Sequence, residues 1–463
     1  MLKKVCFTLS ILLFLIVIFN SIVNFLKFSF SINFFDILAS FLLFIFLLSV
    51  GKLVDLSLNF KNISVSILVY LFSFFILDII LLFFTTNIDF NEIFIITNLF
   101  WTILFIVKLQ KKFYISFPII SLIFLKYFFY KLSNLLTINN NIKGDVEAVF
   151  FDQTKNIYEY SYFFSINNHV MEGYPQFTSY LQALFLQIAQ QQGLYNFYSF
   201  TSYLVFYLSV LFFLELKVAT RSKFLLITLF TSLILNSDWL RFLFTSSLMS
   251  EGIVSLFTGV GFYYLLNNVF KSKIRLSSYL FCFNFGILYF TKQFNSSIVL
   301  IVLIALFLID RKNKALIFGF SGLILKELLY LFIFTNIEKD HHIRQIDVVD
   351  TFFDLLLIRD LKLNNILIIL KNLFIDKPFT IVLLVFYISF TLLIFNSFKE
   401  SEINYYLFFI VNLNLLFVFA LYISVWQNME LDSPIRYFLN LLHLTLVSTF
   451  LNIDKYYKKT IYT

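Results

Sequence analysis

The chain has 463 residues, 60% of them hydrophobic and only 13% charged, and its mean hydropathy is +0.88. Soluble domains carry about 25% charged residues, so this composition excludes an ordinary soluble enzyme. The formal net charge of +8 does not indicate a nucleic-acid partner, because Lys and Arg lie in short clusters between apolar runs. Both cysteines, Cys6 and Cys282, lie inside apolar runs, which argues against a disulfide framework and a cysteine metal site.

Long apolar runs, each able to cross a membrane as a helix, follow one another from the N-terminus. The first run is too long for a signal peptide and lacks a small-residue cleavage site, so we interpret it as a membrane helix. Basic clusters separate alternate pairs of runs and mark the cytoplasmic side. The first five predicted crossings are 5–26, 34–50, 64–86, 93–107 and 114–131, and the basic clusters between them lie at 3–4, 52–61 and 108–112.

Five crossings place the polar and acidic segment 132–174 on the outer side. Beyond it, further crossings alternate in direction so that the later basic clusters again face the cytoplasm. The sequence therefore predicts an all-α polytopic membrane protein with about 14 transmembrane helices, a single transmembrane domain over 1–463 and both termini in the cytoplasm. The later crossings are 196–216, 224–236, 243–267, 277–291, 297–309, 315–334, 379–396, 404–425 and 434–452.

Two apolar stretches, 175–192 and 363–375, are left out of these crossings, because either one would turn later basic clusters outward. We expect them to be helices lying in the outer interface of the membrane. They complete two outer loops, a first loop with its juxtamembrane helix over 132–195 and a second loop over 336–378. The unusual residues of the chain thus gather on one face of the membrane.

The first outer loop carries an acidic pair and a proline element. Asp145 and Glu147 follow the fifth predicted crossing, and GYPQF, with Tyr174 and Pro175, opens the apolar stretch 175–192. This arrangement resembles the GT-C-type glycosyltransferases, which use polyprenyl-phosphate-linked sugars and include mannosyl and aminoarabinosyl transferases. In that family an acidic element follows the helix before the first long outer loop, and a YPP-like element begins a juxtamembrane helix. Late in the chain, DSPIRYFLNLLHL resembles the family's outer RY-LLP segment.

The chain differs from the family in two respects. Its loop follows five helices rather than one, and its proline element has one Pro where the family often has two. The resemblance implies a sugar transfer in which phosphate is the leaving group, so that one base and a cation that holds the phosphate suffice. Hydrolysis of a glycoside would instead need two placed carboxylates. Asp145 is the candidate base in an inverting displacement, and Glu147 is the alternate base or a partner of the acceptor. The alternative is that both are solvated acids of a loop.

The phosphate has a candidate partner at the start of the last predicted crossing. Ser433, Pro434 and Arg436 occupy positions typical of a helix N-terminus, where free N–H groups and a guanidinium favour an anion. The alternative is an interfacial arginine in contact with lipid headgroups. Lys155 and Arg241 are weaker phosphate candidates, for which a role in structure or topology is the alternative.

Other polar residues predicted on the outer face are less specific. His169 is a candidate contact for phosphate or sugar, and Asp238 with Trp239 for an acceptor sugar; surface or interfacial roles are the alternatives. The sequence assigns no cofactor. In the second outer loop, His341 and His342 with nearby carboxylates are candidate ligands of a divalent metal ion. The alternative is an exposed loop that binds no metal.

The leading hypothesis is an inner-membrane glycosyltransferase of a prokaryotic cell envelope. Its partners would be a polyprenyl-phosphate-linked sugar, a glycan, lipid or protein acceptor, and membrane lipids, with no nucleic acid. One alternative is an O-antigen-type polysaccharide polymerase or ligase, which would use Arg344 with His341 or His342. The other is a transporter or flippase for lipid-linked sugars, which should carry polar residues along several helices through the middle of the membrane.

Overall fold

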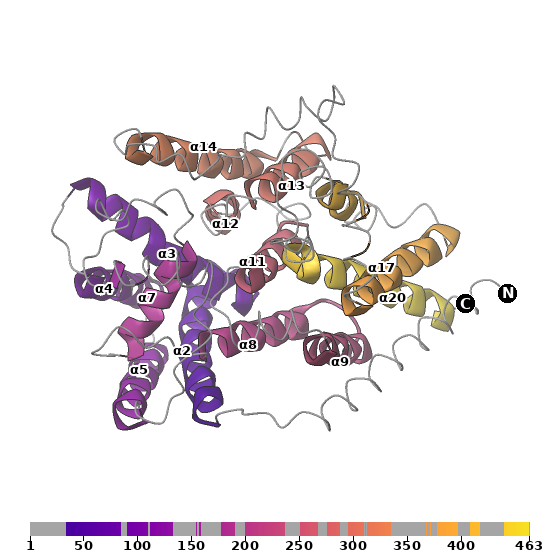
Figure 1. Cartoon of the computed structure of the whole chain (residues 1–463). Helices are drawn as coiled ribbons and strands as arrows, with labels where there is room; N and C mark the ends of the chain where they lie inside the picture. Colours follow the sequence, from indigo (N-terminus) through magenta and orange to yellow (C-terminus); the bar gives the residue numbers. More distant parts are fainter. Residues whose placement is uncertain are drawn as a thin grey trace. The chain divides into compact units, whose positions relative to one another are not determined.

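The computed structural model describes residues 34–84, 90–109, 112–132, 154, 157–158, 177–189, 200–236, 251–266, 276–287, 295–309, 311, 313–334, 367, 371, 377–396, 408–416 and 439–462. Every regular element in these residues is a helix, and they include no strand (Figure 1). The prediction of an all-α protein is therefore confirmed. The predicted crossing 5–26 lies outside the described residues.

In the described residues, helices form at the apolar runs that were predicted to cross the membrane. Residues 408–416, inside the predicted run 404–425, are also helical. The labelled helices are α2 (Phe34–Leu58), α3 (Ile63–Phe84), α4 (Phe90–Leu109), α5 (Lys112–Leu132), α7 (Phe177–Ala189), α8 (Phe200–Glu215), α9 (Thr220–Asn236), α11 (Glu251–Tyr264), α12 (Leu276–Ile287), α13 (Asn295–Ile309), α14 (Lys314–Phe334), α17 (Lys377–Asn396), the 3₁₀ turn η6 (Leu439–Leu441) and α20 (Leu442–Tyr462).

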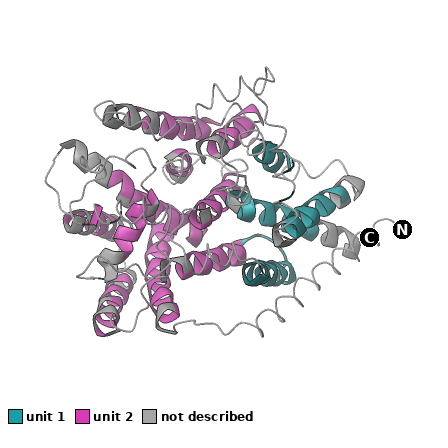
Figure 2. Ribbon diagram, in the orientation of Figure 1, with its two compact units in different colours: residues 1–30, 216–242, 344–463 teal, residues 31–215, 243–343 magenta. Residues whose placement is uncertain are grey.

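The chain divides into two compact units (Figure 2). Unit 1 comprises residues 1–30, 216–242 and 344–463, and its described helices include α9, α17 and α20. Unit 2 comprises residues 31–215 and 243–343, and it holds α2 to α8 and α11 to α14. The single transmembrane domain predicted over 1–463 stays a prediction.

The interior of unit 2 is rich in aromatic contacts. Phe177 of α7 stacks on Phe72 of α3, with ring centroids 4.4 Å apart, and meets Phe75 edge-on at 5.2 Å. Phe257 of α11 lies against the same two residues, 6.1 Å from Phe72 and 6.0 Å from Phe177. All four rings are buried, so α3, α7 and α11 are joined by one apolar cluster.

Unit 2 also contains a close crossing of two helix backbones. A Cβ added at Gly286 of α12 would overlap the carbonyl oxygen of Gly319 on α14, and it would lie 3.1 Å from the Cα of Gly322. Such a close approach of two backbones requires small residues at the crossing. Small residues are common at helix crossings inside membranes, where no hydrophobic effect drives the helices together. The three glycines therefore fix how α12 packs on α14.

Unit 1 is a smaller helical bundle. α17 packs on α20, and it also packs on the helical segment 408–416, where Phe390 and Phe408 stack with ring centroids 3.4 Å apart. α9 packs on α20 through the rings of Phe230 and His443, whose centroids are 5.3 Å apart. α20 begins eight residues after the predicted start at 434 and runs ten residues past the predicted end at 452.

Within the described residues, one stretch, Ile37–Leu58 in α2, is long and apolar enough to span a membrane. Other helices carry shorter apolar stretches of 10–17 residues: Ile63–Leu77, Tyr203–Glu215, Gly252–Tyr264, Val299–Leu308, Lys314–Leu325 and Thr380–Thr391.

Candidate functional site

The side chains predicted to form the active site all lie outside the described residues. They are Asp145, Glu147, Lys155, His169, Tyr174, Pro175, Asp238, Arg241 and Arg436, and the same holds for His341, His342 and Arg344 of the alternative site. The nearest described neighbours of Lys155 are Thr154 and Ile157, and both are buried.

α7 begins at Phe177, two residues after the proline element. A helix was predicted here, and its place is confirmed. All of its described side chains from Phe177 to Phe185 are buried, including Tyr180, whose ring lies 5.7 Å from Phe75. The described side chains of α7 thus belong to the packed interior of unit 2, and its placement in the outer interface stays a prediction. The second predicted interfacial helix, 363–375, lies outside the described residues except for 367 and 371, which are helical.

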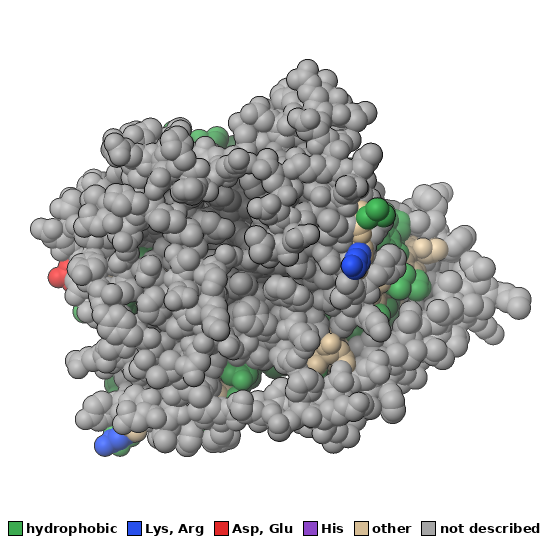
Figure 3. All heavy atoms as spheres, in the orientation of Figure 1, with side chains coloured by type: hydrophobic (Ala, Val, Ile, Leu, Met, Phe, Trp, Pro, Cys, Tyr) green, Lys and Arg blue, Asp and Glu red, His purple; other side chains and the backbone are tan. Residues whose placement is uncertain are grey.

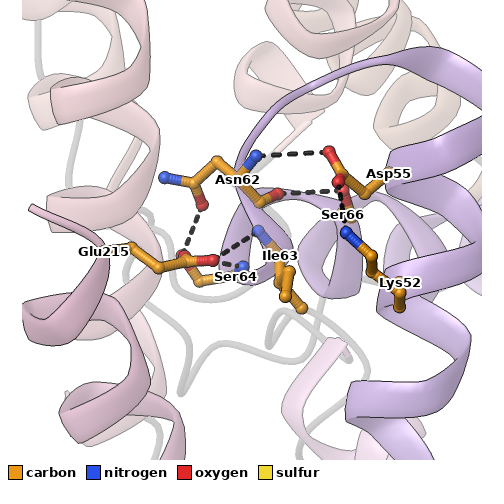
Figure 4. A network of polar contacts seen from close by, with 7 residues as sticks. All are labelled: Lys52, Asp55, Asn62, Ile63, Ser64, Ser66 and Glu215. Carbon is orange, nitrogen blue, oxygen red and sulfur yellow. Dashed lines mark hydrogen bonds and ion pairs between the residues drawn. The ribbon is translucent and has the colours of Figure 1, made fainter.

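The most connected polar group of the described residues surrounds the start of α3 (Figure 4). α2 ends in a short turn in which Asn59 and Lys61 adopt positive φ angles of 57° and 61°. Asn62 then caps α3, because its Oδ1 accepts the backbone N–H of Val65 at 3.0 Å. The turn is held to α2 by Asp55, whose Oδ1 accepts the backbone N–H of Asn62 at 3.3 Å.

Glu215, the last residue of α8, completes this cap from another helix. Its carboxylate accepts the backbone N–H groups of Ile63 at 2.5 Å and Ser64 at 3.0 Å, and the hydroxyl of Ser64 at 2.5 Å. An acid at the C-terminal end of a helix is poorly placed with respect to that helix's own dipole, whereas the N-terminus of α3 favours a negative charge. Glu215 therefore joins α8 to α3.

Unit 1 has a second cap of the same kind. Asp454 of α20 accepts the backbone N–H of Ala219, just before α9, at 2.8 Å, and the hydroxyl of Ser222 at 3.5 Å. Asp454 and Ser222 are both buried. A buried carboxylate bound in this way joins the two helices, because it satisfies a helix N-terminus that would otherwise lack partners.

α20 is buried on every side from Leu442 to Phe450, and buried polar side chains lie among buried apolar ones there. The buried polar residues from η6 to the Asp454 cap are Asn440, His443, Thr445, Ser448, Thr449, Asn452 and Asp454. Thr445 and Thr449 donate to carbonyls one turn earlier in the helix. Asn452 donates to the hydroxyl of Ser389 on α17 at 3.4 Å.

Several of these buried groups lack a partner. Both amide atoms of Asn440, the hydroxyl of Ser448 and the Oδ1 of Asn452 make no hydrogen bond. We call Asn440, Ser448, Asn452 and Ser389 the polar seam. A buried polar group without a partner costs about 1–3 kcal/mol, so the seam needs a physical explanation.

The described polar groups do not make a site for acid–base catalysis. Glu215 and Asp454 are occupied by backbone N–H groups, which makes them structural caps and leaves neither as a free base. In the part of the chain that the structure describes, no cluster of three His, Cys, Asp or Glu side chains could hold a metal ion. Neither cap was predicted from the sequence. For Glu215 the available signal is an acidic residue at the last position of an apolar helix, α8.

Comparison with known proteins gives no relative for this chain. No protein-family model, no curated protein and no solved structure matches it.

Proposed function

We propose that this chain is a multi-pass protein of a prokaryotic inner membrane, with both termini in the cytoplasm. Apolar faces that the described helices leave exposed support the proposal. On α4, Ile95, Leu99 and Ile103 are 55%, 53% and 59% exposed, and they follow the four-residue spacing of one helix face. On the face drawn in Figure 3, the described side chains that reach the surface are chiefly hydrophobic, and the charged ones are isolated. Water disfavours such surfaces, whereas lipid favours them.

The two caps support the proposed orientation. The start of α3 and the end of α8, which lie beside basic residues assigned to the cytoplasm, meet at Glu215. In unit 1, the start of α9 and the basic end of α20, also assigned to the cytoplasm, meet at Asp454. Within each unit, ends assigned to one side of the membrane therefore lie together, as alternate crossing requires.

We propose further that the protein is a glycosyltransferase that uses a polyprenyl-phosphate-linked sugar at the outer face of the membrane. The observation that carries this proposal is the start of α7. In the family that the sequence resembles, the proline element begins a helix, and here a helix begins two residues after Pro175. This helix packs through Phe177 on α3, so the residue two positions after Pro175 belongs to the helical core of unit 2.

In the proposed reaction Asp145 takes the proton of the acceptor hydroxyl. The acceptor oxygen forms a bond to the anomeric carbon on the face opposite the phosphate, the bond from that carbon to the phosphate oxygen breaks, and the lipid phosphate leaves. Glu147 assists the acceptor, and Arg436 holds the phosphate with Lys155 and Arg241. Tyr174, Pro175, His169 and Asp238 line the substrate site. No cofactor takes part.

The test is sugar transfer in membranes that contain the full chain. Membranes are supplied with radiolabelled polyprenyl-phosphate mannose or polyprenyl-phosphate aminoarabinose, and label in glycan, lipid and protein is counted. We expect Asp145→Asn to lower transfer about 100-fold or more, since a general base contributes roughly that factor. The matched control is Asp152→Asn, an acid of the same loop, which should retain activity. Full activity of Asp145→Asn would refute the proposal.

The polar seam favours a transporter or flippase for lipid-linked sugars as a second candidate. Charged residues are few within the apolar helices, but the seam brings uncharged polar groups into the interior of unit 1. In sealed vesicles, a transporter would move a fluorescent polyprenyl-phosphate sugar across the bilayer without forming a new glycosidic bond. The polymerase or ligase alternative predicts the opposite pattern of glycan transfer. Arg344→Ala would lose transfer, whereas Asp145→Asn would retain it.

A further inference from the structure

The polar seam is a group of buried polar side chains that the proposed sugar transfer does not use. Asn440 and Ser448 have no exposed surface, Asn452 is 1% exposed and Ser389 is 4% exposed. Ser448 and Asn452 are four residues apart on α20 and therefore lie on the same face of that helix. Ser389 faces them from α17, through its hydrogen bond with Asn452. The seam thus lies between two packed helices of one unit.

The described unpartnered atoms of unit 1 come from α20, from the turn η6 before it and from the helical segment 408–416. Asn440, Ser448 and Asn452 are all on α20 or at its start, and Asn414, whose Oδ1 also lacks a partner, comes from the helical segment that packs on α17. In unit 2, unpartnered buried atoms occur at Ser57, Thr97, Gln182, Thr258 and Asn284, each on a different helix. A concentration on one helix indicates a shared cause.

We infer that the polar seam is a binding site for an uncharged ligand that offers hydroxyl groups, the hydroxyls being those of water or of a sugar. The free atoms include amide oxygens, an amide nitrogen and a hydroxyl oxygen, so the ligand must both donate and accept hydrogen bonds. The seam itself contains only amide and hydroxyl side chains, which suits a neutral ligand rather than a phosphate or a metal ion. Buried water commonly makes about three hydrogen bonds to such groups.

The inference does not depend on Asp145 or on the first outer loop. Sugar transfer can fail with the seam occupied, and the seam can be dry while sugar transfer proceeds. The two proposals therefore stand or fall on different measurements.

Thiol labelling in membranes tests the seam. In a full chain with Cys6 and Cys282 replaced by alanine, Ser448→Cys changes a single side-chain atom from oxygen to sulfur. The matched control is Val447→Cys, at the preceding residue of the same helix, which is 1% exposed in the native chain. Both variants are treated with methanethiosulfonate ethylammonium, a small water-soluble reagent whose sulfur the thiolate attacks, forming a mixed disulfide and releasing methanesulfinate.

A hydrated or sugar-binding seam should let Ser448→Cys react at least about tenfold faster than Val447→Cys, because a thiol ionises and meets the reagent only where polar solvent reaches it. Equal, slow labelling of both variants would overturn the inference. Repeating the reaction with millimolar glucose, mannose or N-acetylglucosamine distinguishes the sources: slower labelling of Ser448→Cys indicates sugar hydroxyls, and an unchanged rate indicates water.

A second variant keeps the test independent of cysteine chemistry. Ser448→Ala in the native chain removes one unpartnered hydroxyl. If the seam is dry, this removal relieves a buried polar group and raises the Tm in detergent. If a ligand hydroxyl binds Ser448, the Tm stays the same or falls. A raised Tm would therefore also overturn the inference.

Discussion

In unit 2 the helices α3, α7 and α11 meet through aromatic rings, whereas in unit 1 α20 presents amides and hydroxyls to its neighbours. Both interiors are buried, and both units use a carboxylate to cap a helix from a second helix. The difference therefore lies in what fills the space between the helices. Aromatic packing gives a rigid support, while a polar interior has a use only if something binds to it.

The largest expected effect comes from the aromatic interior of unit 2. Phe177→Ala should lower the free energy of unfolding by about 3–5 kcal/mol, because it leaves a cavity beside Phe72 and Phe75. Thermal or chemical denaturation in detergent measures the change. Phe124→Ala is the matched control, since Phe124 on α5 is 57% exposed and its removal leaves no cavity. Equal effects of the two variants would show that the aromatic cluster is not the core of unit 2.

The two caps should have smaller and unequal effects. Glu215→Ala should cost about 2 kcal/mol, because two backbone N–H groups and the hydroxyl of Ser64 lose their acceptor. Asp454→Ala, which removes the acceptor of one backbone N–H and one hydroxyl, should cost about 1 kcal/mol. Denaturation of each variant in the same detergent gives the comparison.

Lys52→Ala is the control for the caps. Its ion pair with Asp55 is 3.5 Å long and its side chain is 51% exposed, so the loss should be below about 1 kcal/mol. A cost for Lys52→Ala that equals the cost for Glu215→Ala would contradict the assignment of the α3 cap to Glu215.

The sequence predicted the helices well and the packing poorly, for different physical reasons. The run 64–86 is predominantly apolar, with Asp78 its one charged residue, and α3 forms there because a helix satisfies its backbone hydrogen bonds within the segment. The close crossing of α12 and α14 was not predicted, because Gly286 and Gly319 come from different helices and no GxxxG pair marks either one. Only the fold brings them together.

Interactions between distant residues account for the other omissions. Glu215 and Ser64 are 151 positions apart, and nothing in either segment identifies the other. The polar seam was overlooked because sequence analysis followed charged residues, whereas Ser448 and Asn452 are uncharged and lie in an apolar run. For α20, the charges after 452 suggested an end, but Lys and Tyr continue a helix readily once it has formed.

We propose that the chain crosses a membrane repeatedly, with the first loop on the outer side and the Glu215 and Asp454 caps on the cytoplasmic side. Single cysteines at Asp152 and Arg221, in a chain without Cys6 and Cys282, test it directly with a membrane-impermeant maleimide on intact cells. We expect Asp152→Cys to be labelled at once, and Arg221→Cys, beside the Asp454 cap, to be labelled only after the membrane is opened. Labelling of both from outside, or of Arg221→Cys alone, would contradict it.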